Sequence, residues 1–150
     1  QELESILLRA KQNKSLADLN ISLIRWLAGL LGISSQYVLA SNLKVEDRRS
    51  QRLVRILKSI NADTYLSPRG SMEYLIEDRQ IFEDAELPVL FQSFTQPIYN
   101  QRYAPFQSGA SAIDLLFNEG ASSTADLMRL GRQLSQNFED IILQNKETSV

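Results

Sequence analysis

The residues best suited to bind an anion form a polar turn over residues 67–71, with the sequence Ser-Pro-Arg-Gly-Ser. Tyr65 and Leu66, just before the turn, favour a β-strand, and a helical pattern follows the turn. Backbone N–H groups at the start of a helix attract phosphate or carboxylate, and an arginine adds a bidentate clamp. The predicted anion-binding residues are therefore Ser67, Arg69 and Gly70. The alternative is that they are ordinary turn residues.

Asp114 is the acidic residue that most needs a partner. It lies within an apolar helical pattern over residues 111–120, and a carboxylate is costly to bury unless it is paired or hydrogen-bonded. Asn118 lies four residues later on the same side of that helix, and Ser111 precedes Asp114 by three residues. Two interpretations stay open. Asp114 either fixes the preceding loop by accepting hydrogen bonds from its backbone N–H groups, or takes part directly in a site.

The composition limits the chemistry that these side chains can carry out. The chain has no cysteine and no histidine, which excludes a thiol nucleophile, a disulfide and the commonest zinc ligand. Acid or base catalysis would therefore fall to Asp, Glu, Tyr or Lys. The sequence contains no P-loop, GxGxxG fingerprint or catalytic triad, which argues against a self-contained hydrolase or NTPase. We predict no metal site and no cofactor.

Charge and hydropathy argue against two classes of partner. The formal net charge is −2, whereas general affinity for nucleic acid or for an anionic membrane depends on an excess of Lys and Arg. No uninterrupted apolar run approaches the roughly 20 residues that span a bilayer. The longest candidate, residues 21–33, contains Arg25. We predict neither a nucleic-acid partner nor a membrane span.

The length of 150 residues, 43% of them hydrophobic, fits one globular domain with a core large enough to fold alone. The periodicity predicts a helical hairpin over residues 1–33, strands over 36–43, 64–66 and 88–94, helices over 46–60, 71–86 and 111–120, and a carboxyl-terminal helix over 123–144. Alternating strands and helices with short turns are typical of parallel pairing with right-handed crossovers. The predicted fold class is therefore α/β, with a small, mostly parallel three-stranded sheet flanked by helices.

Polar residues follow all three predicted strands. Asn42 lies at the end of the first strand, Ser67 at the end of the second and Gln92 near the end of the third. In an open α/β sheet, ligands collect outside the carboxyl ends of the strands, so we predict a pocket at this edge. Residues 95–110 then lack periodicity but are rich in aromatic and amide side chains. A loop of this length is unusual in a compact domain and is often functional.

Several short runs of the chain together resemble one protein family. They are Ser41-Asn42-Leu43, Arg52-Leu53, Ala62-Asp63-Thr64-Tyr65-Leu66-Ser67, Tyr74-Leu75, Phe82, Phe94, Pro97-Ile98-Tyr99, Phe106 and the run from Ser111 to Gly120. These runs, spread over residues 36–120, resemble the WbqC-like family, which is associated with bacterial gene clusters for O-antigen and other surface polysaccharides. Family members usually begin with a His-Gln-Pro segment that this sequence lacks, so the chain resembles their carboxyl-terminal portion or a divergent member of the family.

The resemblance implies a role in the assembly of activated sugars, by group transfer on a nucleotide-linked amino sugar. The loop aromatics Tyr99, Tyr103 and Phe106 would stack on a base or sugar ring, and Asp114 would receive a proton. The implied catalytic residue is Asp114, and the implied substrate-binding residues are Asn42, Arg52, Ser67, Arg69, Gly70, Gln92, Tyr99, Ser111 and Asn118. The implied partner is a nucleotide sugar or another anionic small molecule, and the implied location is the cytoplasm.

A function of a different class also stays open. The leucine-rich faces of the first and last predicted helices would allow the protein to dock another chain, as a non-catalytic interaction module. Its partner would then be a missing amino-terminal portion or a second copy of the chain.

Overall fold

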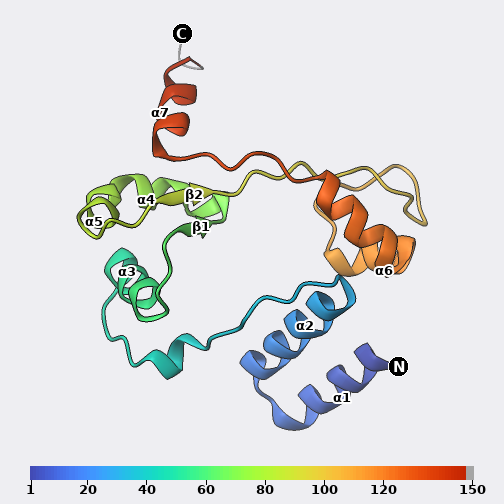
Figure 1. The fold of residues 1–150 in the computed structure, drawn as a ribbon. Coiled ribbons are helices and arrows are strands. Elements are labelled where there is room, and N and C mark those ends of the chain that lie inside the picture. The colour runs from blue at the N-terminus through green and yellow to red at the C-terminus, as the bar shows by residue number, and fades with distance from the viewer. Residues whose placement is uncertain (148–150) are drawn as a thin grey trace. The chain divides into compact units, whose positions relative to one another are not determined.

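The computed structural model describes residues 1–147 of the chain. Backbone contacts divide the chain into two compact units, which we call the helical unit and the strand unit (Figure 1). The helical unit comprises Gln1–Gln36 and Gln96–Leu130, and the strand unit comprises Tyr37–Thr95 and Gly131–Val150. The assignment of both units to a single α/β domain stays a prediction.

The helical unit is built on a hairpin of two helices, α1 (Glu2–Asn13) and α2 (Leu16–Leu30), which pack against each other. Ser15 caps α2, because its hydroxyl accepts a hydrogen bond from the N–H of Asp18 at 3.2 Å. Gly32 follows α2 with φ +68°, a left-handed conformation that glycine adopts without strain. The third helix, α6 (Ala112–Leu130), kinks at Gly120, where φ is 78° and ψ is 169°.

The strand unit alternates helices with two short strands. Its elements are η1 (Ala40–Leu43), α3 (Arg49–Ser59), β1 (Tyr65–Ser67), η2 (Arg69–Ser71), α4 (Met72–Glu77), α5 (Arg79–Asp84), β2 (Val89–Phe91) and α7 (Phe138–Glu147). The two strands are parallel, with Tyr65 opposite Val89 and Ser67 opposite Phe91. The segment between them, which contains α4 and α5, is the crossover. The α/β class and the parallel pairing predicted from the sequence are therefore confirmed.

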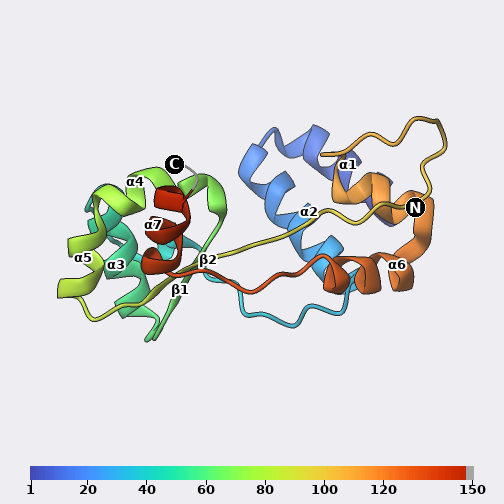
Figure 2. The ribbon, with the colours of Figure 1, turned by 90° about the horizontal axis from the view of Figure 1, so that it is seen from above.

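The helices α3, α4, α5 and α7 surround the two strands and contribute to the core of the strand unit (Figure 2). The core consists of Val54 and Leu57 from α3, Leu75 from α4, Phe82 from α5, Leu87, Val89 and Phe91 around β2, and Phe138 and Ile141 from α7. The rings of Phe91 and Phe138 meet edge to face with centroids 5.3 Å apart, so α7 packs directly on the sheet.

The prediction of a third strand over residues 36–43 is wrong, because the described sheet has only the two strands β1 and β2. Tyr37, Val38 and Leu39 are exposed, with 44%, 54% and 41% of their surface accessible, and the chain then forms η1. Residues with high β-propensity form a strand only where a neighbouring strand accepts their backbone hydrogen bonds. Because no such neighbour lies beside them in the described chain, their sequence preference is not realised.

The carboxyl-terminal helix predicted over residues 123–144 is broken in the structure. The helix α6 ends at Leu130, the segment 131–137 runs beside the end of β2, and α7 begins only at Phe138. Antiparallel bridges join Phe91 to Gln136 and Phe94 to Arg132. The leucine spacing indicated one helix, but tertiary pairing with the strand unit overrides that pattern.

Candidate functional site

The Asp114 carboxylate forms the centre of a hydrogen-bonded cluster in the helical unit. Its Oδ2 atom accepts hydrogen bonds from the Tyr99 hydroxyl at 2.7 Å and from Nε2 of Gln101 at 3.1 Å. Its Oδ1 atom accepts one from Nδ2 of Asn118 at 3.2 Å, and the same Nδ2 donates to the Asp114 carbonyl oxygen at 2.8 Å. The predicted residues Tyr99, Asp114 and Asn118 therefore lie together, and both carboxylate oxygens are already engaged.

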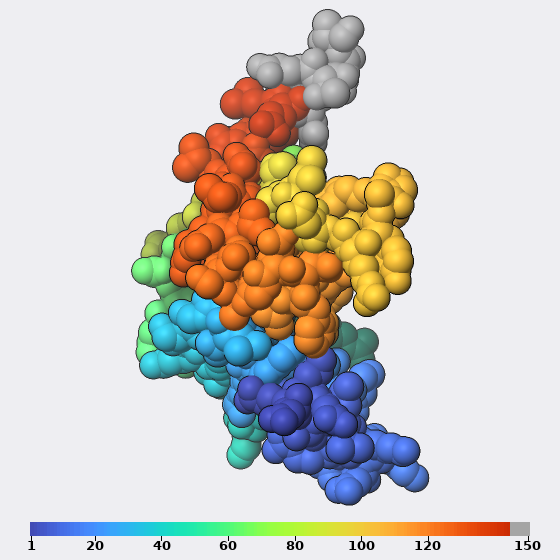
Figure 3. All heavy atoms as spheres, turned by 90° about the vertical axis from the view of Figure 1, so that its right-hand side faces the viewer, coloured from blue at the N-terminus to red at the C-terminus, as the bar shows by residue number. Residues whose placement is uncertain are grey.

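Other polar side chains fix the loop over residues 96–111, which Figure 3 shows in gold as a lobe on the surface beside α6 in orange. The Gln101 side chain pairs with the backbone of Gln107, accepting from its N–H at 2.7 Å and donating to its carbonyl at 3.0 Å. Glu119 on α6 accepts a hydrogen bond from the N–H of Asn100 at 2.9 Å. These contacts replace the backbone ladders that the loop lacks.

Tyr99 connects the loop to α6. Only 7% of its surface is exposed, and its ring meets that of Phe106 edge to face, with centroids 5.3 Å apart. The hydrogen bond to the Asp114 carboxylate, and then burial, raise the pKa of the Tyr99 hydroxyl above its ordinary value. Tyr99 is therefore a hydrogen-bond donor held against a carboxylate. Ser111 has a different role, since its hydroxyl accepts a hydrogen bond from the N–H of Ile113 at 3.2 Å at the start of α6.

A second cluster lies in the strand unit, at the carboxyl ends of β1 and β2. The N–H of Gln92 donates to the carbonyl of Ser67 at 2.8 Å, so these two predicted residues are neighbours. Ser67 is fully buried, whereas Arg69 on η2 is exposed. Beyond the strands is a hollow of about 590 Å³, which we call the strand-end hollow. Its lining residues are Arg69, Ser93, Gln133, Leu134, Ser135, Gln136, Asp140, Leu143 and Gln144.

The segment 131–137 and the first turn of α7 form one wall of the strand-end hollow. The segment is held by the bridge between Phe91 and Gln136, and α7 begins with a reciprocal cap. In this cap the Asn137 side chain accepts the N–H of Asp140 at 2.9 Å, and the Asp140 side chain accepts the N–H of Asn137 at 3.0 Å. The polar lining therefore rests on backbone that is paired or capped.

The remaining predicted residues lie elsewhere in the strand unit. Asn42 is exposed on η1 rather than at a strand end, which corrects its predicted position, because the expected strand does not form. Arg52 is exposed on α3, and Gly70 lies in η2; neither lines the strand-end hollow. The ten predicted residues thus divide between the units. Those in the helical unit are Tyr99, Ser111, Asp114 and Asn118, and those in the strand unit are Asn42, Arg52, Ser67, Arg69, Gly70 and Gln92.

Sequence reasoning did not identify several lining and loop residues. Gln133, Gln136 and Asp140 lie within residues 123–144, which were predicted to form one helix, and Gln101 was noted only as an amide residue of the loop. Two signals for the true boundaries were present in the sequence. Gly131 follows directly after Leu130, where a helix end is favourable, and Asn137 precedes Asp140 by the three residues of a capping box.

Two general properties of the described residues bear on the site. Through residue 147, no group of three or more acidic side chains is arranged to hold a metal ion. None of the helices in the same residues has the length and apolar character needed to cross a bilayer.

The fold and clusters define an α/β protein with a parallel strand pair and a polar hollow at its carboxyl edge. Comparison with known families gives a more particular assignment, because the model of the WbqC-like protein family matches residues 1–126. The chain therefore belongs to the WbqC-like protein family. The match includes the amino-terminal helices as well as the stretch over residues 36–120 on which the sequence resemblance was based.

One relative among curated proteins is the uncharacterized protein Rv1507c of Mycobacterium tuberculosis. It is 27% identical to this chain over 124 residues, which are 82% of this chain and 52% of the relative. The chain thus spans about half the length of that relative. No solved structure matches the chain significantly.

Proposed function

We propose that the strand-end hollow binds the diphosphate of a nucleotide-linked amino sugar, and that the protein serves group transfer in the biosynthesis of bacterial surface polysaccharide. The observation that carries the proposal is the position of Arg69 in a polar hollow of about 590 Å³ at the carboxyl edge of two parallel strands. Ligands of α/β proteins bind at this edge, and a guanidinium can clamp two phosphate oxygens. Membership of the WbqC-like family supports the proposed context, the biosynthesis of bacterial surface polysaccharide.

The other lining residues suit the sugar part of such a ligand. Gln133, Gln136 and Ser93 offer amide and hydroxyl groups, which can donate and accept hydrogen bonds with sugar hydroxyls. Asp140 adds a carboxylate that can accept from an amine or a hydroxyl. The apolar contribution comes from Leu134 and Leu143, both of them exposed. The hollow thus combines one cationic group and one carboxylate with neutral polar groups and an apolar surface.

Asp114 fits a positioning role better than the role of a proton acceptor. Three side-chain donors already engage its oxygens, and one of them is the hydroxyl of the nearly buried Tyr99. These donors occupy three of the roughly four acceptor sites of a carboxylate, so most of its capacity is used inside the helical unit. We therefore propose that Asp114 fixes the loop over residues 96–111, through side-chain donors rather than the backbone N–H groups expected from the sequence.

The proposal is tested by calorimetric titration with a uridine-diphosphate amino sugar, with uridine alone and the free amino sugar as comparison ligands. We expect Arg69→Ala to weaken binding of the diphosphate compound about tenfold or more, because a hydrogen bond to a charged group contributes roughly 1.5–3 kcal/mol. Arg132→Ala is the matched control, since Arg132 is exposed in the same unit and does not line the hollow.

Three results would count against this site. The first is an unchanged thermal transition of the full chain with a panel of nucleotide sugars. The second is equal loss of affinity in the Arg69 and Arg132 variants. The third is loss of affinity in Arg52→Ala but not in Arg69→Ala, which would transfer the anion site to α3, where the family resemblance suggested Arg52.

We propose, as the second candidate, a protein-interaction module that docks another chain on α1. The observation that favours it is a mostly apolar hollow of about 420 Å³ in the helical unit, lined by Gln1, Leu3, Glu4, Leu7, Leu8, Lys11 and Phe117. Leu7, Leu8 and Phe117 are 50%, 58% and 68% exposed. Sedimentation separates the candidates: a monomer that binds nucleotide sugars supports the first, and an oligomer that ignores them and dissociates with Leu8→Lys supports the second.

A further inference from the structure

Two opposite charges line the strand-end hollow. Arg69 on η2 supplies a guanidinium, and Asp140 in the first turn of α7 supplies a carboxylate. Both residues are exposed, and neither forms an ion pair within the described residues. A diphosphate bound at Arg69 would be repelled by the Asp140 carboxylate unless the ligand also carried a positive charge beside it. The two charges therefore match a ligand with charges of both signs.

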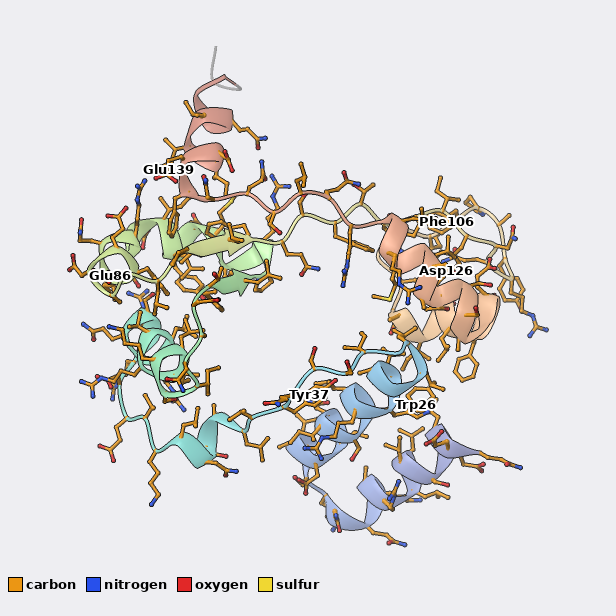
Figure 4. The ribbon with its side chains drawn as sticks, in the orientation of Figure 1. Trp26, Tyr37, Glu86, Phe106, Asp126 and Glu139 are labelled. Carbon is orange, nitrogen blue, oxygen red and sulfur yellow. The ribbon has the colours of Figure 1, made fainter. Side chains whose placement is uncertain are left out.

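Asp140 differs in its partners from the acidic residue directly before it. Glu139, which Figure 4 labels in the first turn of α7, forms an ion pair with Arg79 and does not line the strand-end hollow. Asp140 lines the hollow and has no such partner among the described side chains. The charge of Glu139 thus connects α7 to α5, whereas the charge of Asp140 is available to a ligand.

The cap of α7 holds the Asp140 carboxylate in position before a ligand binds. Its Oδ2 atom accepts the N–H of Asn137 at 3.0 Å, and its own N–H donates to the Asn137 side chain at 2.9 Å. Within the described residues, no donor reaches the Oδ1 atom of Asp140. One oxygen therefore orients the carboxylate, and the other can accept a hydrogen bond from a ligand while the cap stays intact. Orienting a binding group in advance lowers the entropy lost on binding.

An ammonium group is the part of a sugar that suits Asp140 best. It has three N–H donors and no acceptor, so it can pair with Oδ1 of Asp140 and also donate to neutral oxygens nearby. The amide side chains of Gln133 and Gln136 and the hydroxyl of Ser93 line the same hollow and offer such oxygens. A sugar hydroxyl or an acetamide could also donate to the carboxylate, but neither would balance its charge. Charge-assisted hydrogen bonds are about twice as strong as neutral ones, which favours the ammonium.

We propose that the strand-end hollow selects a nucleotide sugar whose amine is free and protonated, with the diphosphate at Arg69 and the ammonium at Oδ1 of Asp140. This inference rests on the proposed function, and it narrows the ligand from amino sugars in general to those that are not acylated. An acylated amine carries no charge, so it leaves the Asp140 carboxylate uncompensated beside the phosphates, and the site rejects it for that reason. Asp140 is therefore the specificity-determining residue, and the sugar reaches this protein before its amine is acylated.

The experiment is a calorimetric titration of the full chain with uridine-diphosphate sugars that differ in one substituent: an amine, an acetamide or a hydroxyl group. One series carries the substituent beside the anomeric carbon, and a second carries it on the opposite side of the ring. At mildly acidic pH, where the amine is protonated, we expect the amine compound of at least one series to bind about tenfold more tightly than the other two. This comparison on the parent chain depends on no variant.

Asp140→Asn then tests the residue, because asparagine keeps an oxygen for the cap and removes only the charge. We expect it to weaken binding of the amine compound about tenfold and to leave the acetamide and hydroxyl compounds bound equally well or more tightly. Glu139→Gln is the matched control, since it removes a charge from the same turn of α7 but lies outside the hollow. It should leave all three affinities unchanged.

The outcomes separate this inference from the proposed function. Equal affinity for the three substituents in both series would overturn selection of a free amine, while loss of all three affinities in Arg69→Ala would still support the diphosphate site. An equal change of all three affinities in Asp140→Asn would also overturn the inference, because Asp140 would then act only through the cap of α7 or through Arg69. If none of the compounds bound, or if Arg69→Ala changed no affinity, both the inference and the proposed function would be wrong.

Discussion

Each of the two units is stabilised internally by a different kind of interaction. In the strand unit, eight apolar residues from five elements and Leu87 from the segment before β2 form a continuous buried core, and Leu75, Phe82 and Phe91 are at most 1% exposed. In the helical unit, Leu7, Leu8, Leu16 and Leu30 of α1 and α2 are exposed, and the loop over residues 96–111 is positioned by amide, hydroxyl and carboxylate groups. Apolar packing therefore fixes the parallel strands, whereas a polar network fixes the loop.

This difference predicts which property a substitution changes in each unit. The free energy gained by apolar burial is proportional to the buried area, so removing one large side chain causes a large loss. A hydrogen bond contributes a small net free energy, but its geometry is specific. Substitutions in the strand unit should thus act mainly on the free energy of unfolding. Substitutions in the polar network should act mainly on the conformation of the loop.

The largest expected effect is that of Phe82→Ala in the strand unit. Phe82 is 1% exposed and stacks on Tyr65, with ring centroids 6.1 Å apart. Removing a buried phenyl ring leaves a cavity and costs about 3–5 kcal/mol in the free energy of unfolding. Phe117→Ala in the helical unit is the matched control, because Phe117 is 68% exposed, and we expect a loss below about 1 kcal/mol.

Urea unfolding followed by circular dichroism measures both variants. If the two phenylalanine variants lost the same free energy, the contrast between the units would be wrong. Two transitions in the parent chain, with only one of them moved by Phe82→Ala, would instead sharpen the contrast, because the units would then unfold separately.

Gly131→Ala should have the next largest effect. A Cβ atom at Gly131 would lie 2.5 Å from the Phe94 ring and 2.6 Å from the carbonyl oxygen of Thr95. The N–H of Thr95 also donates to the carbonyl of Gly131 at 2.9 Å, so the two backbones cannot separate without losing this bond. Overpacking of this kind costs about 1–3 kcal/mol.

Gly29→Ala provides the control for Gly131. Nothing lies within 4 Å of a Cβ atom at Gly29, which is inside α2, so alanine should stabilise the chain by about 0.5–1 kcal/mol. Opposite shifts of the thermal transition are therefore expected for two identical substitutions. Shifts of the same sign would show that the close approach at Gly131 does not constrain the strand unit.

Tyr99→Phe should destabilise the chain by roughly 1–2 kcal/mol, because it leaves the Asp114 carboxylate without its shortest hydrogen bond. The effect depends on pH. The pKa of Tyr99 is raised in the folded chain, so its stabilising contribution is complete below the unfolded value of about 10 and is lost as the pH rises through the folded value.

Unfolding measured between neutral and strongly alkaline pH tests both parts of the Tyr99 prediction. The parent chain should lose its advantage over Tyr99→Phe only on the alkaline side. Tyr103→Phe is the control, since Tyr103 is 75% exposed in the same loop and should show neither effect. An advantage of the parent chain that is equally large at neutral and strongly alkaline pH would contradict the prediction.

In both units, the sequence predicted the elements that local signals specify better than it predicted the pairing of distant segments. The two parallel strands and the polar turn at Arg69 follow from local signals, namely β-prone residues before Pro68 and helical spacing between the strands. The division of the predicted site residues between the two units did not follow, because no local signal states which distant segments share a core. Residues 37–39 have the composition of a strand, but the sheet in the described part of the chain consists of β1 and β2.

The candidate sites were predicted in the same uneven way. The need of Asp114 for a partner was predictable from its apolar neighbours, but the identity of the donors was not, since Tyr99 and Gln101 are 15 and 13 residues away. The strand-end hollow was predicted from its strand edge, whereas its far wall was missed because the leucine spacing over residues 127–141 indicated one helix. Pairing between Phe91 and Gln136 decided that region.

The smallest expected effect concerns the cap of α2. Ser15→Ala removes the hydroxyl that accepts the N–H of Asp18, and the loss of one N-cap costs about 0.5–1 kcal/mol. Ser15→Asp is the matched variant, because aspartate caps a helix about as well as serine, and it should retain most of the stability. Thermal unfolding of the two variants side by side measures the difference. If Ser15→Asp lost as much as Ser15→Ala, α2 would depend on packing rather than on its cap, and the helical unit would resemble the strand unit more than its exposed leucines indicate.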